Sequence, residues 1–422
     1  MKHAPHPGLA EFLRVFARIG VLSFGGPAAQ IALMHRELVE RARWLDERSF
    51  LNALSFCMVL PGPEAMQLAT YAGWKLRGTW GGIAAGLLFV LPGAAVIFGL
   101  ATAYVIHGAL PLVAALFLGV KATVVIVVIE ALLRVARKAL TGAAGRIIAV
   151  LSFIGIFVLQ LPFPLIILAA AAWGAWRASA ASEDHAAAPL RPRTLRTVAV
   201  WAGLWAAPVL MLAALDQTLL LSIAGFFSKM AVVTFGGAYA VLAYMTQEVV
   251  ANQGWLTTAQ MMDALGLAET TPGPLILVTQ FVGFMAGFGQ GGMPLAFLAG
   301  LVTLWVTFVP CFLWIFAFAP YVDGIATRPR LTGALTAITA AVVGVIANLS
   351  IWFAVHVFFA DVGVLALGPV RMVWPDPATL NLPALGLALV AAGLLLRLRW
   401  NLPGVLALMA AAGAGLWAAD VV

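Results

Sequence analysis

The stretch Ser23-Phe24-Gly25-Gly26-Pro27, followed downstream by Pro61-Gly62-Pro63, decides how this chain folds, because both motifs occur twice. They return as Thr234-Phe235-Gly236-Gly237 and Pro272-Gly273-Pro274, at one shared offset of 211 positions. About a third of the paired positions in 16–63 are identical between the copies, and a single gap of seven residues extends the match further along the chain. Chance does not maintain such a register, so the sequence predicts an internal duplication.

The composition identifies the class of protein. Hydrophobic residues make up 63% and charged residues 10% of the 422 positions, and the mean hydropathy is +1.02. A soluble core of this length cannot bury so much apolar surface. Long uncharged runs recur, each close to the roughly 20 apolar residues that a membrane helix needs, and they lack the alternation of barrel strands. The sequence therefore predicts an all-α, polytopic membrane helical bundle, and repeats in such a protein indicate a transporter.

Each copy contains two apolar segments that its motifs interrupt, followed by four cleaner ones. In the first copy the interrupted segments are 12–34 and 50–74, and a polar surface helix, 35–48, is expected between them. Further segments are expected at 80–104, 109–133, 147–160, 163–176, 197–215, 219–245, 261–288, 293–320, 331–357, 380–396 and 402–419. We divide the chain into a first repeat (1–177), a cytoplasmic linker with one extra span (178–218) and a second repeat (219–422).

The extra span places an odd number of crossings between the copies, which predicts that the second copy is inverted. The charges agree, because the loop between the first two segments carries four arginines in copy one, whereas the matching loop 246–258 has Glu248 and no basic residue. Basic residues mark the cytoplasmic side, so the N-terminus and the linker are predicted inside and the C-terminus outside. The loops on both sides of segment 50–74 are basic, so we expect the interrupted helices to be broken or re-entrant.

The breaks themselves are predicted to form an anion site. Glycine and proline interrupt the helical hydrogen-bond ladder, and lipid cannot satisfy the exposed backbone groups. In inverted-repeat transporters, half-helix N-termini at the midplane offer N–H donors and a positive dipole end to an anion. One break would more simply be a kink, but four at duplicated positions favour a site. The motif residues assigned to it are Phe24, Gly25, Gly26, Pro61, Gly62, Pro63, Phe235, Gly236, Gly237, Pro272, Gly273 and Pro274.

Three cations within apolar segments, where an unpaired charge is unfavourable, are candidates for a role in transport. Arg18 and Lys229 are aligned by the duplication, so we predict that both bind the anion. The alternative is that they extend to the membrane interface as anchors. Lys121 lies near the middle of its span, and its repeat partner is Thr339, so it is predicted to be an asymmetric substrate contact or a counter-charge.

Each copy also has one carboxylate beside its Pro-Gly-Pro break. Glu64 directly follows the first break, whereas Glu269 precedes the second. A buried carboxylate can take up and release protons near neutral pH, so both are predicted proton-coupling residues. A helix cap or a salt bridge is the structural alternative for each.

Other polar residues in the apolar segments have simpler interpretations. Glu130 lies four residues before Arg134, the spacing of an ion pair within one helix. Asn52 and Asp263 lie near segment starts, where helix capping is expected.

Cysteine and histidine positions argue against a metal or a disulfide. Cys57 and Cys311 occupy unrelated repeat positions within apolar runs, so both are predicted to be buried thiols. His107 and His356 have no ligand partner at helical spacing. We expect no metal and no cofactor.

The motif residues resemble those of a known family. Phe24-Gly25-Gly26-Pro27, Pro61-Gly62-Pro63-Glu64 with Gln67, and the degenerate second copy are similar to the long-chain chromate ion transporters, the CHR family. The resemblance covers nearly the whole chain. It implies a secondary active transporter in the bacterial inner membrane that exports chromate from the cytoplasm, confers chromate resistance and does not itself hydrolyse ATP. The sequence departs from the first-copy motif at Ala238, in place of proline, and at Leu275, in place of glutamate.

The substrate and the class of transport stay open at this point. Chromate and sulfate are both tetrahedral dianions, and no residue separates them. A passive anion channel is a second class, although broken inverted repeats suit alternating access. An intramembrane enzyme is the least favoured class, because the sequence lacks the metalloprotease, nucleophile-elbow and phosphate-loop motifs.

The expected partners are an oxyanion such as chromate and the lipid bilayer. The basic residues lie singly or in short groups at the ends of apolar runs, so no nucleic acid is expected. The sequence leaves homodimer formation open.

The inverted arrangement gives a direct test. Single cysteines placed at Arg41 and Asn252, in a background without Cys57 and Cys311, should react with an impermeant maleimide from opposite sides of the membrane. Labelling of both positions from one side would show that the copies run parallel.

Overall fold

The computed structural model describes residues 7–179, 192–235, 237–322, 328–367 and 370–419. It divides into two compact units that each draw on both halves of the sequence. Unit 1 comprises Met1–Thr102, Ser182–Ala238 and Thr271–Leu331, and unit 2 comprises Ala103–Ala181, Tyr239–Thr270 and Thr332–Val422.

Unit 1 is built from helices that the glycine and proline motifs separate. Its elements are α1 (Leu9–Leu22), α2 (Gly26–His35), the π-helix η1 (Arg36–Arg41), α3 (Glu47–Cys57), most of α4 (Glu64–His107), α8 (Pro192–Ala214), α9 (Thr218–Val233), η3 (Leu275–Leu277), α12 (Val278–Phe318) and η4 (Ala319–Tyr321).

Both interrupted segments of the first copy fold back on themselves. The rings of Phe12 and Phe16 on α1 lie 6.3 and 6.5 Å from the ring of Trp44, which follows η1. Across the second break, the rings of Phe56 on α3 and Tyr71 on α4 lie 5.9 Å apart. Each motif is therefore the tip of a helical hairpin, as expected for broken segments.

The two longest helices, α4 and α12, each contain a sharp reversal at glycine. Gly78 (φ 64°, ψ −159°) and Gly292 (φ 65°, ψ −161°) take nearly identical left-handed conformations. A non-helical residue precedes each of these glycines. No residue type other than glycine adopts this backbone conformation readily. The arms pack closely, because the position of a Cβ at Gly73 is occupied by the Gly81 carbonyl oxygen.

Unit 2 contains the other elements. They are α5 (Pro111–Ala139), α6 (Ala143–Phe157), α7 (Phe163–Ser179), α10 (Ala238–Thr246), the π-helix η2 (Gln247–Asn252), α11 (Thr258–Thr270), α14 (Pro329–Phe358), β1 (Val362–Leu367), β2 (Val370–Pro375), η5 (Pro377–Thr379), α15 (Leu382–Ala392), the π-helix η6 (Gly393–Arg397) and α16 (Leu402–Ala418).

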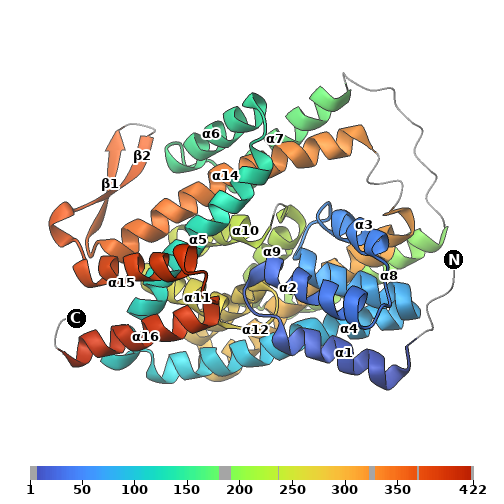
Figure 1. Cartoon of the computed structure of the whole chain (residues 1–422), viewed down its shortest axis with the longest axis horizontal. Coiled ribbons are helices and arrows are strands. Elements are labelled where there is room, and N and C mark those ends of the chain that lie inside the picture. The colour runs from blue at the N-terminus through green and yellow to red at the C-terminus, as the bar shows by residue number, and fades with distance from the viewer. Residues whose placement is uncertain (1–6, 180–191, 236, 323–327, 368–369, 420–422) are drawn as a thin grey trace. The chain divides into compact units, whose positions relative to one another are not determined.

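The core of unit 2 forms where α15 and α16 pack along α5 (Figure 1). Ala122 of α5, Leu387 of α15 and Met409 of α16 are buried together. At Gly119 the helices approach so closely that a Cβ would coincide with the carbonyl oxygen of Met409. Small residues that allow backbones this close are typical of helix pairs in membranes.

Five described helices are long and apolar enough to cross a membrane, and several shorter apolar helices accompany them. The five are Glu64–His107, Pro111–Ala139, Arg193–Ala214, Leu275–Tyr321 and Pro329–Phe358. The predicted all-α, multi-pass class is confirmed.

Two local predictions differ from the structure. The surface helix expected at 35–48 is instead the six-residue η1, because the chain leaves the helix after Arg41, Arg43 takes a left-handed backbone (φ 52°) and Asp46 caps the next helix, α3. The Asp46 carboxylate accepts hydrogen bonds from the N–H and hydroxyl groups of Ser49, which lower its pKa. The segment between 357 and 380, for which no element was predicted, contains the antiparallel hairpin β1–β2.

Several local features recur in both copies. The π-helices η1 and η2 match residue for residue at 211 positions, and the glycine reversals of α4 and α12 share one conformation. π-Helices are rare, so this recurrence supports a common origin of the copies. The inverted orientation and the repeat boundaries stay predictions.

The contact at Gly119 gives a stability test. We expect Gly119→Ala to lower the thermal stability of the detergent-purified protein, because an extra methyl group in a closely packed core costs about 1–3 kcal/mol. A matched control is Gly203→Ala on α8, where no atom lies within 4 Å of the added Cβ. Equal unfolding temperatures for the two variants would contradict the packing of α5 on α16.

Candidate substrate-binding site

The breaks of the two copies are joined inside unit 1 by a reciprocal pair of backbone hydrogen bonds. The N–H of Gly62 donates to the carbonyl oxygen of Thr234 at 2.9 Å, and the N–H of Gly273 donates to that of Ser23 at 2.8 Å. Gly62 and Gly273 are equivalent positions of the duplication, as are Ser23 and Thr234. Each Pro-Gly-Pro break therefore binds the Phe-Gly-Gly break of the other copy.

The hydroxyl groups beside these carbonyls are used within their own helices. Ser23 Oγ donates to the carbonyl oxygen of Ile19 at 2.5 Å, and Thr234 Oγ1 donates to that of Met230. Both side chains are fully buried. The Ser23 hydroxyl satisfies the Ile19 carbonyl, because the Ser23 N–H donates to Gly20 instead, whereas the Met230 carbonyl accepts from both the N–H and the hydroxyl of Thr234.

We call the four breaks and the two hydrogen bonds that join them, Gly62 to Thr234 and Gly273 to Ser23, the crossing. Three buried glutamines surround it and stabilise it. The Nε2 group of Gln30 donates to the Gly273 carbonyl at 2.6 Å, and that of Gln67 donates to the Pro61 carbonyl at 2.6 Å. Gln280 Nε2 donates to the Ala94 carbonyl at 3.0 Å. The buried Oε1 atoms of all three accept no hydrogen bond from any described residue. The amide N–H groups therefore satisfy carbonyls that the interrupted helices expose.

Helices begin directly after the breaks, and their first N–H groups lack side-chain caps at two of them. The α2 helix starts at Gly26, after Gly25 in a left-handed conformation (φ 85°), and no side chain accepts its first N–H groups. The η3 turn that opens α12 starts after Pro274 and is likewise uncapped. Uncapped N-termini combine N–H donors with a partial positive charge, which suits an oxyanion.

The structure describes all the predicted motif residues except Gly236. Pro272, Gly273 and Pro274 are fully buried. Phe24 at the tip of the first hairpin is 37% exposed. The crossing thus has a buried centre and one more accessible tip.

The predicted cations have different surroundings. Arg18 is exposed on α1, and its guanidinium lies 4.0 Å from Glu37 Oε2, whereas Glu37 Oε1 pairs with Arg41 at 2.6 Å. Lys229 is exposed at the equivalent position on α9. Both therefore lie in unit 1, on helices that lead into the crossing.

Lys121 forms a buried ion pair in unit 2. Its Nζ lies 3.2 Å from Asp263 Oδ1, and the hydroxyl of Tyr104 donates to Asp263 Oδ2 at 2.7 Å. The counter-charge interpretation of Lys121 matches this geometry. The capping prediction for Asp263 is wrong, because the residue lies inside α11 and neutralises a cation on another helix.

The two predicted proton-coupling carboxylates lie in different units. Glu64 is half-buried at the first position of α4 in unit 1. Glu269 is buried near the end of α11 in unit 2, and its Oε1 accepts a hydrogen bond from the Tyr239 hydroxyl at 2.9 Å. The predicted intrahelical pair of Glu130 and Arg134 is present at 2.7 Å.

Sequence reasoning missed several polar partners. Gln30 and Gln280 were not singled out, nor were Tyr104 and Tyr239. The available signal was a polar side chain within an apolar run, which is unfavourable unless it is hydrogen-bonded. That signal does not identify the partner, which lies on another helix or, for Gln30, in the break at Gly273.

Comparison with known proteins agrees with the geometry. The model of the chromate transporter family matches residues 10–175 and 221–416. A chromate transport protein of Pseudomonas aeruginosa is 32% identical, with 80% of this chain and 79% of the relative covered. A chromate transport protein of Cupriavidus metallidurans is 30% identical, with 81% and 82% covered. An uncharacterized transporter of Bacillus subtilis is 31% identical over 42% of this chain and 89% of its own length. No solved structure gives a significant match. Two matched segments that together span most of the sequence show that the chain belongs to the chromate transporter family.

Proposed function

We propose that this chain transports chromate, or a similar tetrahedral oxyanion, across the membrane through the crossing of the four breaks. The observation that carries the proposal is the reciprocal bonding of the breaks beside uncapped helix N-termini. Membership of the chromate transporter family supports the substrate class. Sulfate has the same charge and shape and is the main alternative substrate.

In this proposal the motif residues of both copies form the anion site. The backbone N–H groups at the starts of α2, α4 and α12 are the donors, and Gly25, Gly62 and Gly273 allow the backbone to turn at the site. Arg18 and Lys229 attract the dianion toward it from equivalent helices. Lys121 acts as the counter-charge of Asp263 and does not contact the substrate.

Transport is proposed to be outward and secondary active. An inside-negative potential favours the exit of a dianion by about 4.6 kcal/mol per 100 mV, so voltage alone can drive export. Glu64 and Glu269 would add coupling to protons. Export of chromate from the cytoplasm across the inner membrane would confer resistance.

We favour a carrier over a passive channel, because the predicted inverted repeats suit alternating access and the breaks of the two copies are hydrogen-bonded directly to each other. Uptake of radiolabelled chromate into inverted vesicles, with sulfate as competitor and with or without a pH gradient, tests the proposal. Saturable chromate uptake that unlabelled internal chromate accelerates is expected. Uptake no faster than in vesicles without the protein would refute it.

The reciprocal bonds predict matched effects of two substitutions. Gly62 has φ 119° and Gly273 has φ 89°, and an added Cβ at Gly62 would lie 2.8 Å from Gln67 Nε2. The strain of about 1–3 kcal/mol should lower chromate transport at least tenfold in Gly62→Ala and in Gly273→Ala. Membrane abundance should be measured in parallel, with Gly203→Ala as the control. Normal transport in either variant would show that the break carrying the substitution is not part of the substrate site.

The ion pair of unit 2 predicts a rescue by double substitution. Lys121→Met alone leaves the Asp263 carboxylate buried without its cation, which costs about 3–5 kcal/mol and should reduce the amount of folded protein. Lys121→Met combined with Asp263→Asn should restore both folded protein and chromate uptake. A double variant that is folded but inactive would instead show that Lys121 contacts the substrate.

The last prediction concerns energy coupling. A carboxylate that must titrate makes transport depend on pH, so Glu64→Gln should leave chromate binding intact but remove the response of transport to an imposed pH gradient at fixed voltage. The parallel variant Glu269→Gln tests the second carboxylate. If both variants keep the pH response of the parent protein, neither carboxylate couples transport to protons.

A further inference from the structure

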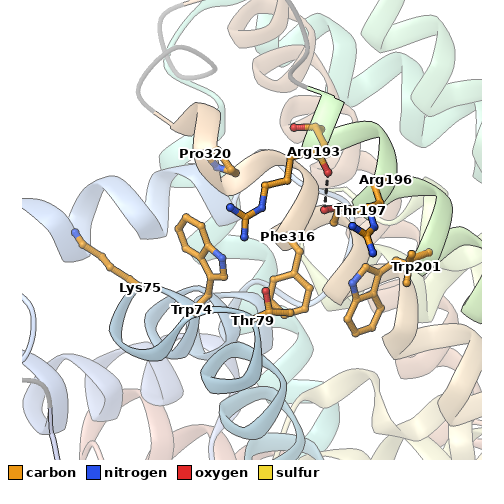
Figure 2. Close-up of a pocket in the computed structure, with 12 residues that line it drawn as sticks. Trp74, Lys75, Thr79, Arg193, Arg196, Thr197, Trp201, Phe316 and Pro320 are labelled. Carbon is orange, nitrogen blue, oxygen red and sulfur yellow. Dashed lines mark hydrogen bonds between the residues drawn. The ribbon is translucent and has the colours of Figure 1, made fainter.

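A basic pocket lies at one end of unit 1, apart from the crossing. The reversal of α4 at Gly78, the first turns of α8 and the end of α12 enclose about 900 Å³ (Figure 2). Eleven residue steps along α4 separate Glu64 from Lys75, which is roughly 17 Å of helix. The pocket is therefore a separate site within the same unit.

Positive charge dominates the lining. Lys75, Arg193 and Arg196 line the pocket, and none of the described carboxylates does so. Figure 2 shows the guanidinium group of Arg193 between Trp74 and Phe316 and that of Arg196 beside Trp201, whereas Lys75 extends away from the other labelled side chains. Among the described residues, neither arginine forms an ion pair. The pocket thus presents two guanidinium groups that no described carboxylate neutralises.

The floor is aromatic and continues into a face suited to lipid. Trp74, Trp201 and Phe316 line it, and the rings of Trp201 and Phe316 lie 5.1 Å apart. Only 6% of the most apolar window of α8 is buried inside the protein. Leu195 and Val200, in the first turns of that helix, are 59% and 51% exposed. Tryptophan beside arginine at the end of an apolar helix is typical of the membrane interface.

The size of the pocket and the membrane leaflet that it faces both favour a lipid, rather than the transported ion, as its ligand. A pocket of this volume is far larger than one tetrahedral oxyanion, but it accommodates a phospholipid headgroup. The basic residues indicate the cytoplasmic side, where anionic lipids are concentrated and where basic pockets between helices bind their headgroups. The phosphodiester would lie against Arg193 and Arg196, and the acyl chains would follow the apolar face of α8.

We propose that this pocket binds the phosphodiester headgroup of an anionic phospholipid of the cytoplasmic leaflet.

The test measures lipid binding to the full-length protein. Native mass spectrometry in detergent, with phosphatidylglycerol and phosphatidylethanolamine as probes, should show preferential binding of phosphatidylglycerol. Arg193→Gln combined with Arg196→Gln should weaken that binding about thirtyfold, because each basic residue near an anionic membrane contributes about a factor of five. The charge-conserving pair Arg193→Lys and Arg196→Lys should retain most of it.

The matched control removes the same charge elsewhere. Arg137 and Arg146 are exposed on α5 and α6 of unit 2, and their replacement by Gln should leave phosphatidylglycerol binding unchanged. The proposal is overturned if the parent protein shows no preference between the two lipids, or if the Arg193 and Arg196 glutamine variant binds like the control. Displacement of the lipid by millimolar chromate or inorganic phosphate would also overturn it, because the pocket would then belong to the path of the transported ion.

Discussion

The rest of the structure depends on the reciprocal hydrogen bonds between the breaks, Gly62 to Thr234 and Gly273 to Ser23. In a membrane protein an interrupted helix exposes backbone groups that lipid cannot satisfy, so every break needs a protein partner. Here each Pro-Gly-Pro break obtains its partner from the Phe-Gly-Gly break of the other copy. Neither copy satisfies its breaks alone, which explains why unit 1 draws on both halves of the sequence.

The polar side chains of the interior follow the same constraint. Gln30 and Gln67 use their amide N–H groups to satisfy carbonyls that the breaks expose. In unit 2, Lys121 is neutralised by Asp263, which Tyr104 also binds. A charge or amide in an apolar interior is tolerated only when it is paired or hydrogen-bonded. Polar groups that the protein does not saturate, such as the uncapped start of α2, are therefore the better candidates for binding substrate.

Exposed charges are arranged differently from buried ones. Arg193 and Arg196 lie at the end of an apolar helix with aromatic neighbours and without a described carboxylate partner, whereas Lys121 is held by one. The first arrangement suits a ligand from the membrane surface, and the second suits a fixed structural role. The same physical rule thus separates a proposed lipid site from an internal counter-charge.

The sequence by itself determined the membrane class, the duplication, the positions of the breaks and the close Glu130–Arg134 pair, because these depend on composition or on residues near one another in the chain. Even local geometry differed from the prediction at the π-helix η1, which ends at Arg41, before the left-handed Arg43, whereas Asp46 caps the next helix. Only the tertiary structure decided which groups meet across long separations. The partner of Gly62 is Thr234 and the partner of Lys121 is Asp263, and both pairs lie more than a hundred residues apart. A polar residue in an apolar run indicates that a partner is required. The packing of the helices determines which residue that partner is, and local sequence does not encode this packing.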